Sequence, residues 1–166
     1  MSHTELLTKF LALPGRIAII SACSAGKARS DLNPNAYLSA DELDDPLQRV
    51  HGERRLANYM LPAAEMYTGQ GHRYVRSSVA LLRTHGFPVM HYILSAGYGL
   101  LHEQTLIAPY DVTFSGKSAT WITARGRQLG IAQQLQELAH EKERLLIILG
   151  RQYLISIRIF RLNIRA

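Results

Sequence analysis

The chain has 166 residues, of which 47% are apolar and 19% charged, which is the size and composition of one globular domain that needs no disulfides or structural metals. Every apolar run is shorter than the roughly 18 residues that span a bilayer, and residues 1–10 lack the apolar segment of a signal peptide. A single cysteine excludes an internal disulfide and a cysteine-rich zinc site, so we expect a cytoplasmic protein that is not bound to a membrane.

The formal net charge of +6 is concentrated at the carboxyl end. Residues 151–166 contain four arginines and no acidic residue, which leaves +2 on residues 1–150. A basic tail of this kind binds phosphate backbones without sequence preference, and it is equally compatible with a solvated end. The body of the chain is not strongly basic.

The amino-terminal half predicts two helices around a buried strand. Leucines at helical spacing indicate a helix over residues 4–13, and the apolar run from Ile17 indicates a buried strand that ends near Cys23. The turn residues and acidic run of residues 28–46 favour a long loop. Residues 47–67 are compatible with a helix interrupted by Pro62, whose arginines form a solvated face or bind phosphate.

The carboxyl-terminal half repeats this alternation. The patterns predict a helix over residues 71–84, a strand over 89–95, a loop to residue 118, a long helix from Trp121 to about residue 140, and a strand over 145–149. Alternating apolar residues in 153–166 indicate an edge strand.

Strands that alternate with helices of this length form parallel β-α-β units with right-handed crossovers. We therefore predict a single α/β domain over residues 1–166, with three layers, a mostly parallel sheet and helices on both faces. Because the last stretch ends without a capping signal, we expect the natural chain to continue beyond it.

Three predicted strands end in loops rich in small or polar residues, after Ile20, after Leu94 and at Gly150. In open α/β sheets ligands bind beyond the carboxyl ends of the strands. These loops are therefore the candidate site.

The first loop holds Cys23, four residues before Lys27. A nearby lysine depresses the pKa of a thiol and makes it nucleophilic, whereas a lone cysteine is also a common buried filler. The segment is similar to a phosphate-binding loop, but Ser21 stands at the first glycine position and Ala28 replaces the magnesium-binding hydroxyl. A nucleoside-triphosphate hydrolase is not expected, although the turn and Lys27 could hold one phosphate or carboxylate.

The second loop contains Gly97, Tyr98 and Gly99. The glycines allow close backbone approach to a ligand, and the tyrosine offers a stacking face and a hydroxyl donor; a tight turn would need the same glycines for geometry alone. Farther along, Asp111 is the carboxylate best suited to general base work, or alternatively forms a turn. The seven histidines show no metal-binding spacing, so neither a metal nor another cofactor is expected.

Four blocks of sequence carry a resemblance to a known family. They are Ser21-Ala-Cys-Ser24 with Lys27, Pro62-Ala-Ala-Glu-Met-Tyr-Thr-Gly69, Ile93-Leu-Ser-Ala-Gly-Tyr-Gly-Leu100 and Ile107-Ala-Pro-Tyr-Asp-Val-Thr113. Together, from about Ile17 to Tyr153, they resemble a bacterial and phage domain family related to the YaaA peroxide-stress proteins and, distantly, to the core domain of archaeosine synthase.

The resemblance implies a nucleic-acid or nucleobase partner, because the YaaA branch is associated with DNA binding under oxidative stress and the archaeosine synthase core acts on a 7-deazaguanine base in transfer RNA. The latter pairs a cysteine with a lysine four positions later, as Cys23 and Lys27 do. Its Pro-Tyr after the lysine is replaced here by Ala28-Arg29, and its later histidine is absent. Substrate and reaction are therefore not carried over.

The sequence predicts an enzyme that modifies a nucleic acid or nucleobase, a transferase or a hydrolase. Cys23 would be a nucleophile or polar contact, Lys27 would hold an anion or activate the thiol, and Asp111 would handle a proton. Tyr98 or Tyr110 would stack on a base. The expected substrate-binding residues are Ser21, Ser24, Tyr67, Ser95, Gly97, Tyr98, Gly99, Tyr110 and Thr113.

The alternative is a noncatalytic stress or defence protein that binds DNA or RNA through the same loops. Steep loss of affinity with salt would indicate such a binder, whereas competition by a free nucleoside would indicate a base pocket. A stress or defence protein with a protein partner is a third, weaker reading, for which the sequence shows no specific surface.

Overall fold

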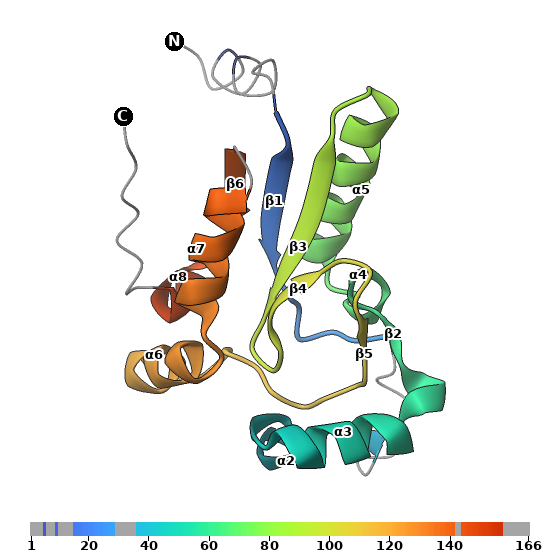
Figure 1. Ribbon diagram of the computed structural model, residues 1–166, viewed down its shortest axis with the longest axis vertical. Coiled ribbons are helices and arrows are strands. Elements are labelled where there is room, and N and C mark those ends of the chain that lie inside the picture. Colours follow the sequence, from blue (N-terminus) through green and yellow to red (C-terminus); the bar gives the residue numbers. More distant parts are fainter. Residues whose placement is uncertain (1–4, 6–8, 10–14, 29–35, 142–143, 158–166) are drawn as a thin grey trace.

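A computed structural model describes residues 5, 9, 15–28, 36–141 and 144–157. Its main sheet has four strands in the order β4-β3-β1-β6, with bounds β1 (Ile17–Ala22), β3 (Val89–Ser95), β4 (Gly99–His102) and β6 (Arg144–Ile148). Strand β1 runs parallel to both β3 and β6, and β4 runs antiparallel to β3 (Figure 1). The predicted α/β fold with a mostly parallel sheet is confirmed.

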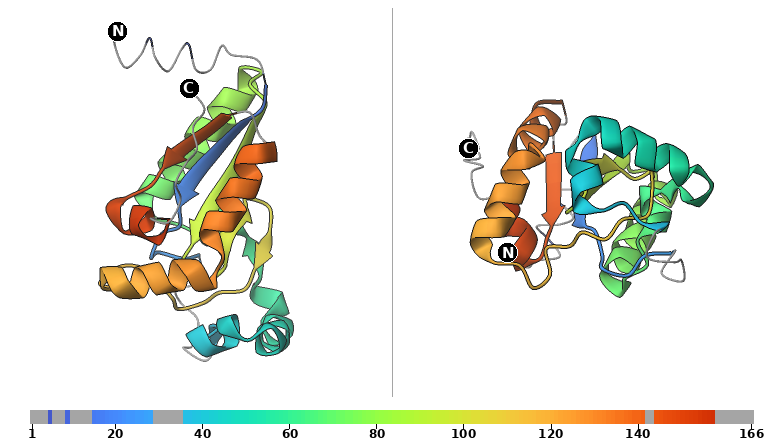
Figure 2. Two further views of the ribbon diagram at one scale, coloured as in Figure 1. Left: turned by 60° about the vertical axis from the view of Figure 1, so that its left-hand side comes forward. Right: turned by 90° about the horizontal axis from the view of Figure 1, so that it is seen from below.

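Helices cover both faces of this sheet (Figure 2). Helix α5 (Gln70–Thr84) packs through Val79 on Ile17 and Ile19 of β1. The alternate residues Ala18 and Ile20 belong to the larger core, which includes the apolar sides of α6 (Ala119–Gln128) and α7 (Ile131–Glu141). The period-two alternation of a strand thus supplies one face to each helical layer.

The predicted loop over residues 28–46 is partly wrong, because it contains α2 (Ala40–Asp44) and leads directly into α3 (Pro46–Arg55). Ser39 and Glu42 form a capping box at the start of α2. Asp45 caps α3, with Pro46 at its first position. The acidic run is therefore a pair of helix starts, where carboxylates satisfy free backbone amides.

Residues 47–67 do not form one helix. Helix α3 ends at Arg55 and is followed by the short helix η2 (Ala57–Tyr59), β2 (Leu61–Pro62) and α4 (Ala63–Met66). Strand β2 pairs antiparallel with β5 (Leu106–Ile107), which lies with β4 inside the stretch predicted as a loop to residue 118. These short strands depend on pairing between distant segments and have no local periodicity.

The predicted helix from Trp121 to about residue 140 is broken at Leu129-Gly130, where Gly130 has a φ of +62°. The predicted edge strand is also wrong over residues 153–156, which belong to helix α8 (Arg151–Ser156). Helix α8 lies against α6, where a side chain at Gly126 would meet the carbonyl of Ser156. The rest of that predicted strand, residues 158–166, and most of the predicted helix over 4–13 lie outside the described residues.

Within the described part of the chain, every helix is too short or too polar to cross a membrane.

Candidate functional site

A cavity of about 500 Å³ lies at the carboxyl ends of β1 and β6, beside the start of α5. This volume is in the range of small-ligand pockets. Two of the three predicted strand ends therefore meet at one cavity, while the loop after β3 does not line it. The lining residues are Ser21, Ala22, Cys23, Ser24, Gly71, His72, Val75, Ile148, Leu149 and Gly150.

Cys23 is 8% exposed and lies directly after β1, where its amide is held by the carbonyl of Leu94. Its Sγ lies 3.0 Å from the hydroxyl oxygen of Tyr153, and that hydroxyl donates to the Cys23 carbonyl, also at 3.0 Å. Tyr153 has one hydroxyl hydrogen, so the thiol is the donor in the first contact while the carbonyl bond exists. If the thiol loses its proton, the Tyr153 hydrogen can turn to the sulfur.

A second hydroxyl reaches the same sulfur through a buried chain. The Oγ of Ser95 accepts the amides of Gly97 and Tyr98, so its own hydrogen is directed to the Tyr110 oxygen at 2.8 Å. Tyr110 then donates either to Tyr67, 2.9 Å away, or to the Cys23 sulfur, 3.8 Å away. This chain supplies a hydrogen-bond donor to a thiolate at Cys23.

The phenols around Cys23 stay protonated. Burial raises the pKa of Tyr67, Tyr110 and Tyr153 well above the ordinary tyrosine value, and the nearby charge of Cys23 raises each pKa further. A phenol that does not ionise is a donor and not a base. The arrangement therefore favours negative charge on sulfur over negative charge on oxygen.

Lys27 supplies the positive charge of the site. Its Nζ lies 4.6 Å from the centre of the Tyr110 ring, and its backbone pairs with Tyr67 in an antiparallel bridge. Burial lowers the pKa of Lys27, and attraction to Cys23 and Asp111 partly offsets this. Lys27 is thus a cation that gives up its proton more readily than an exposed lysine.

The predicted residues Asp111 and Thr113 lie farther out. Asp111 is exposed and acts on Lys27 through its charge, while its backbone amide is bound to the Leu38 carbonyl. Thr113 accepts the amide of Ser115. Both side chains are outside the cavity wall, and their catalytic and substrate-binding roles stay predictions.

Ser24 ties the turn after β1 to the residue that precedes α5. Its Oγ donates to the Gly26 carbonyl at 2.7 Å and accepts the Gly69 amide at 3.0 Å. A Cβ at Gly69 would lie only 2.4 Å from the Cβ of Ser24, so glycine is needed there. The hydroxyl is thus committed to the backbone, although the residue lines the cavity.

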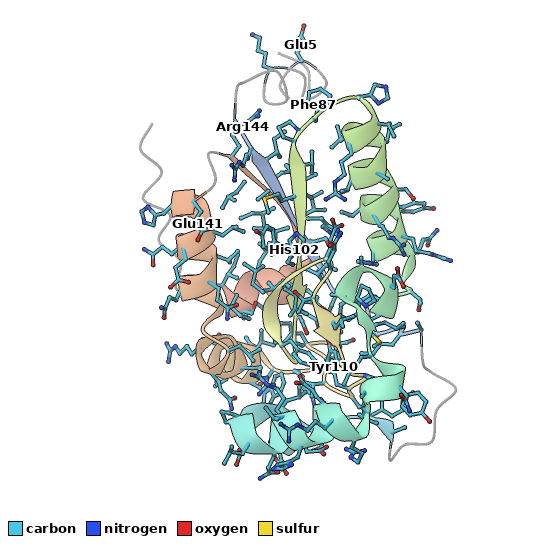
Figure 3. The ribbon with its side chains drawn as sticks, turned by 45° about the vertical axis from the view of Figure 1, so that its right-hand side comes forward. Glu5, Phe87, His102, Tyr110, Glu141 and Arg144 are labelled. Atoms are coloured by element: carbon cyan, nitrogen blue, oxygen red, sulfur yellow. The ribbon has the colours of Figure 1, made fainter. Side chains whose placement is uncertain are left out.

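The glycine loop after β3 supports Tyr110. A Cβ at Gly97 would lie 2.6 Å from the Tyr110 ring, and Gly99 has a φ of +81° that favours glycine. The rings of Tyr98 and Tyr110 meet edge to face, with centres 5.3 Å apart. Tyr110 lies beyond the ends of the strands, toward α2 and α3 (Figure 3), and has no exposed surface, so its hydroxyl and not its ring face serves the site.

Ser21 faces away from this cluster and joins a polar set that sequence reasoning missed. Its Oγ lies 2.9 Å from Nε2 of His91, whose Nδ1 lies 3.3 Å from Glu103, and Glu103 is bound by Arg83 at 2.6 Å. Burial lowers the pKa of His91 to about 4, against the opposing charge of Glu103. The signal in the sequence that could have revealed this set was a histidine, His91, inside the apolar run of β3. In the structure, His91 lies opposite Ile19 of β1.

Tyr153 was also missed as a site residue. It lies a few positions after the predicted end of the third strand. The other candidate residues were chosen because they too follow the ends of predicted strands. The described residues contain no group of three histidine, cysteine or acidic side chains placed to hold a metal ion.

The model of a family of unknown function, DUF6884, matches residues 49–164, which is more than half of the chain. No curated protein and no solved structure matches significantly.

Proposed function

The chain belongs to the DUF6884 family of unknown function, and from its site we propose that it is an enzyme that modifies a nucleobase, free or within a nucleic acid, with Cys23 as the nucleophile. The observation that carries the proposal is the position of Cys23 on the wall of a cavity of about 500 Å³, with the hydroxyl oxygens of Tyr153 and Tyr110 lying 3.0 Å and 3.8 Å from its sulfur. A thiol given two potential donors and a nearby cation is equipped for thiolate chemistry.

The reaction begins with addition of the thiol to a C=N bond of the base. Lys27 in its neutral form takes the thiol proton as the sulfur forms a bond to the electrophilic carbon, and the π electrons move to nitrogen. Lys27 then gives that proton to the nitrogen, so no charge is gained or lost. The lowered pKa of Lys27 suits this transfer, and Asp111 holds its charge in place.

The cavity fits one planar base better than a stretch of nucleic acid. Its walls are formed by Val75, Leu149 and other small or apolar residues, and its polar groups are few. The resemblance to the YaaA-related family is consistent with a base as ligand. The mechanism needs a reduced thiol, a state that the reducing cytoplasm would maintain.

The single cysteine makes the proposal easy to test, because any thiol reagent reports on Cys23 alone. Alkylation by iodoacetamide is followed by intact-protein mass spectrometry with and without nucleosides, nucleotides and oligonucleotides. We expect a nucleoside or nucleotide to slow alkylation, with weak dependence on salt.

The result that contradicts the proposal is retention of nucleic acid that leaves the alkylation rate unchanged and falls steeply with salt. That result would indicate the noncatalytic binding protein.

A further inference from the structure

We propose that Glu103 and His91 orient the hydroxyl of Ser21 so that its oxygen is a hydrogen-bond acceptor toward the cavity, and that the cavity therefore selects a base edge carrying an amino group. The inference rests on the proposed function and names the substrate class of the same cavity. It follows from hydrogen positions along the series of contacts from the exposed Arg83 to the buried Ser21.

Charge fixes the outer end of this series of contacts, at Arg83 and Glu103. Arg83 donates to one oxygen of Glu103 at 2.6 Å and to the carbonyl of Val89 at 3.0 Å. Glu103 is 7% exposed and its second oxygen faces Nδ1 of His91 at 3.3 Å. The geometry of this contact is not that of a hydrogen bond, so Glu103 acts on the imidazole through its charge, and a carboxylate charge favours a hydrogen on the nitrogen that it faces.

A neutral imidazole carries one hydrogen, so placing it on Nδ1 leaves Nε2 as an acceptor. His91 has no exposed surface and its low pKa keeps it neutral at physiological pH. The bond of 2.9 Å to Ser21 must then be donated by the serine hydroxyl. Only the lone pairs of Ser21 remain for a ligand, and Ser21, although buried, belongs to the cavity wall.

A second acceptor lies on the same wall. His72 lines the cavity and its Nε2 lies 3.0 Å from the Ala64 carbonyl, so this nitrogen carries the hydrogen. Its Nδ1 is then an unprotonated acceptor that is buried behind the wall and has no partner among the described residues. Burial lowers the pKa of His72 too, which keeps the ring neutral. Two neutral acceptors select N–H donors and reject carbonyl oxygens.

Natural bases offer pairs that exchange an amino group for a carbonyl, adenosine with inosine and cytidine with uridine; the neighbouring ring nitrogen changes at the same time from an acceptor to an N–H donor. We expect the wild-type protein to bind the amino member of at least one pair about tenfold more tightly than the carbonyl member. The amino group gains a hydrogen bond to the Ser21 oxygen, whereas a carbonyl oxygen would be repelled by it. Ser21→Ala should lose the preference and Ser21→Thr should keep it.

The decisive variant is Glu103→Gln, which has the same shape. Arg83 holds the amide oxygen, so the amide hydrogens face Nδ1 of His91 and move the ring hydrogen to Nε2. The imidazole then donates to Ser21, whose hydroxyl hydrogen turns into the cavity. The preference should reverse toward inosine or uridine.

Nitrogen-15 NMR of the His91 ring reads the orientation without a ligand. We expect hydrogen on Nδ1 in the wild type and on Nε2 in Glu103→Gln. Hydrogen on Nε2 in the wild type would overturn the inference. So would nucleoside binding in which Glu103→Gln keeps the wild-type preference for the amino member of the pair. Failure of every nucleoside to bind would instead contradict the proposed function, and the NMR result would still decide the orientation of Ser21.

Discussion

The hydroxyl of Tyr153 lies 3.0 Å from the sulfur of Cys23, although the two residues are 130 positions apart in the chain. One comes from the end of β1 and the other from α8, which follows β6, the neighbour of β1 in the sheet. Parallel pairing brings the ends of these strands to one edge, so the contact is a direct product of the topology.

Tyr153→Phe tests what this hydroxyl contributes. The change removes the partner of both the Cys23 sulfur and the Cys23 carbonyl, so we expect the free energy of unfolding to fall by about 1–2 kcal/mol. Urea denaturation measures this. Tyr74→Phe is the control, because its exposed hydroxyl accepts only from Gln70, and its stability should not change. Equal stability of Tyr153→Phe and the wild type would contradict the role of Tyr153.

Gly97→Ala tests the close packing of the second loop on Tyr110. The added Cβ would lie 2.6 Å from the ring, so we expect a loss of roughly 1–3 kcal/mol in unfolding free energy. Gly71→Ala is the matched control, since no atom lies within 4 Å of the added Cβ and alanine favours helix α5 by up to about 1 kcal/mol. Similar effects of both changes, measured by thermal unfolding, would refute this account of Gly97.

Arg125→Met tests how helix α6 holds the loop that follows β3. Arg125 is buried, forms an ion pair with Asp44, and donates to the carbonyls of Ala96 and Gly97. Leaving these carbonyls without donors should cost roughly 3 kcal/mol of stability. Arg127→Met, an exposed position on the same helix, should have little effect. Denaturant titration of the two variants decides the point.

The stability of the protein should depend on pH through His91. Its pKa is lowered in the folded state from 6.5 to about 4, so the unfolded chain binds the extra proton first as pH falls. Stability is therefore full above pH 6.5 and decreases toward pH 4, by up to roughly 3 kcal/mol from this residue. His72 adds to the same trend. Urea midpoints that do not fall between pH 7 and pH 4.5 would contradict this reading.

The elements that could be predicted from the sequence are those with a strong local pattern. Strands β1, β3 and β6 and helix α5 appear within about one residue of their expected bounds, because apolar runs or apolar periodicity, with Pro or Gly at their ends, mark them. The loop with Cys23 and Lys27 could be predicted as well, because it follows the carboxyl end of a predicted strand.

The elements that could not be predicted depend on distant partners. Strands β2 and β5 are two residues long and exist through their mutual pairing. The partners of Ser21 and Cys23 follow from sheet register and from the packing of α8, neither of which leaves a local signal. The capping box of α2 was readable as Ser39 and Glu42, but the surrounding acids made it look like a loop.

The central claim is that Cys23 performs chemistry on a nucleobase, and nucleoside mass spectrometry tests it most directly. Transfer RNA, single-stranded DNA and duplex DNA are incubated with the wild type, with Cys23→Ala, and with Ser77→Ala, an exposed position on α5, as control. We predict a released base or a changed nucleoside mass with the wild type and Ser77→Ala that is lost with Cys23→Ala. Equal products from all three proteins, or no product from a wild type that binds nucleic acid in a salt-sensitive manner, would contradict the account.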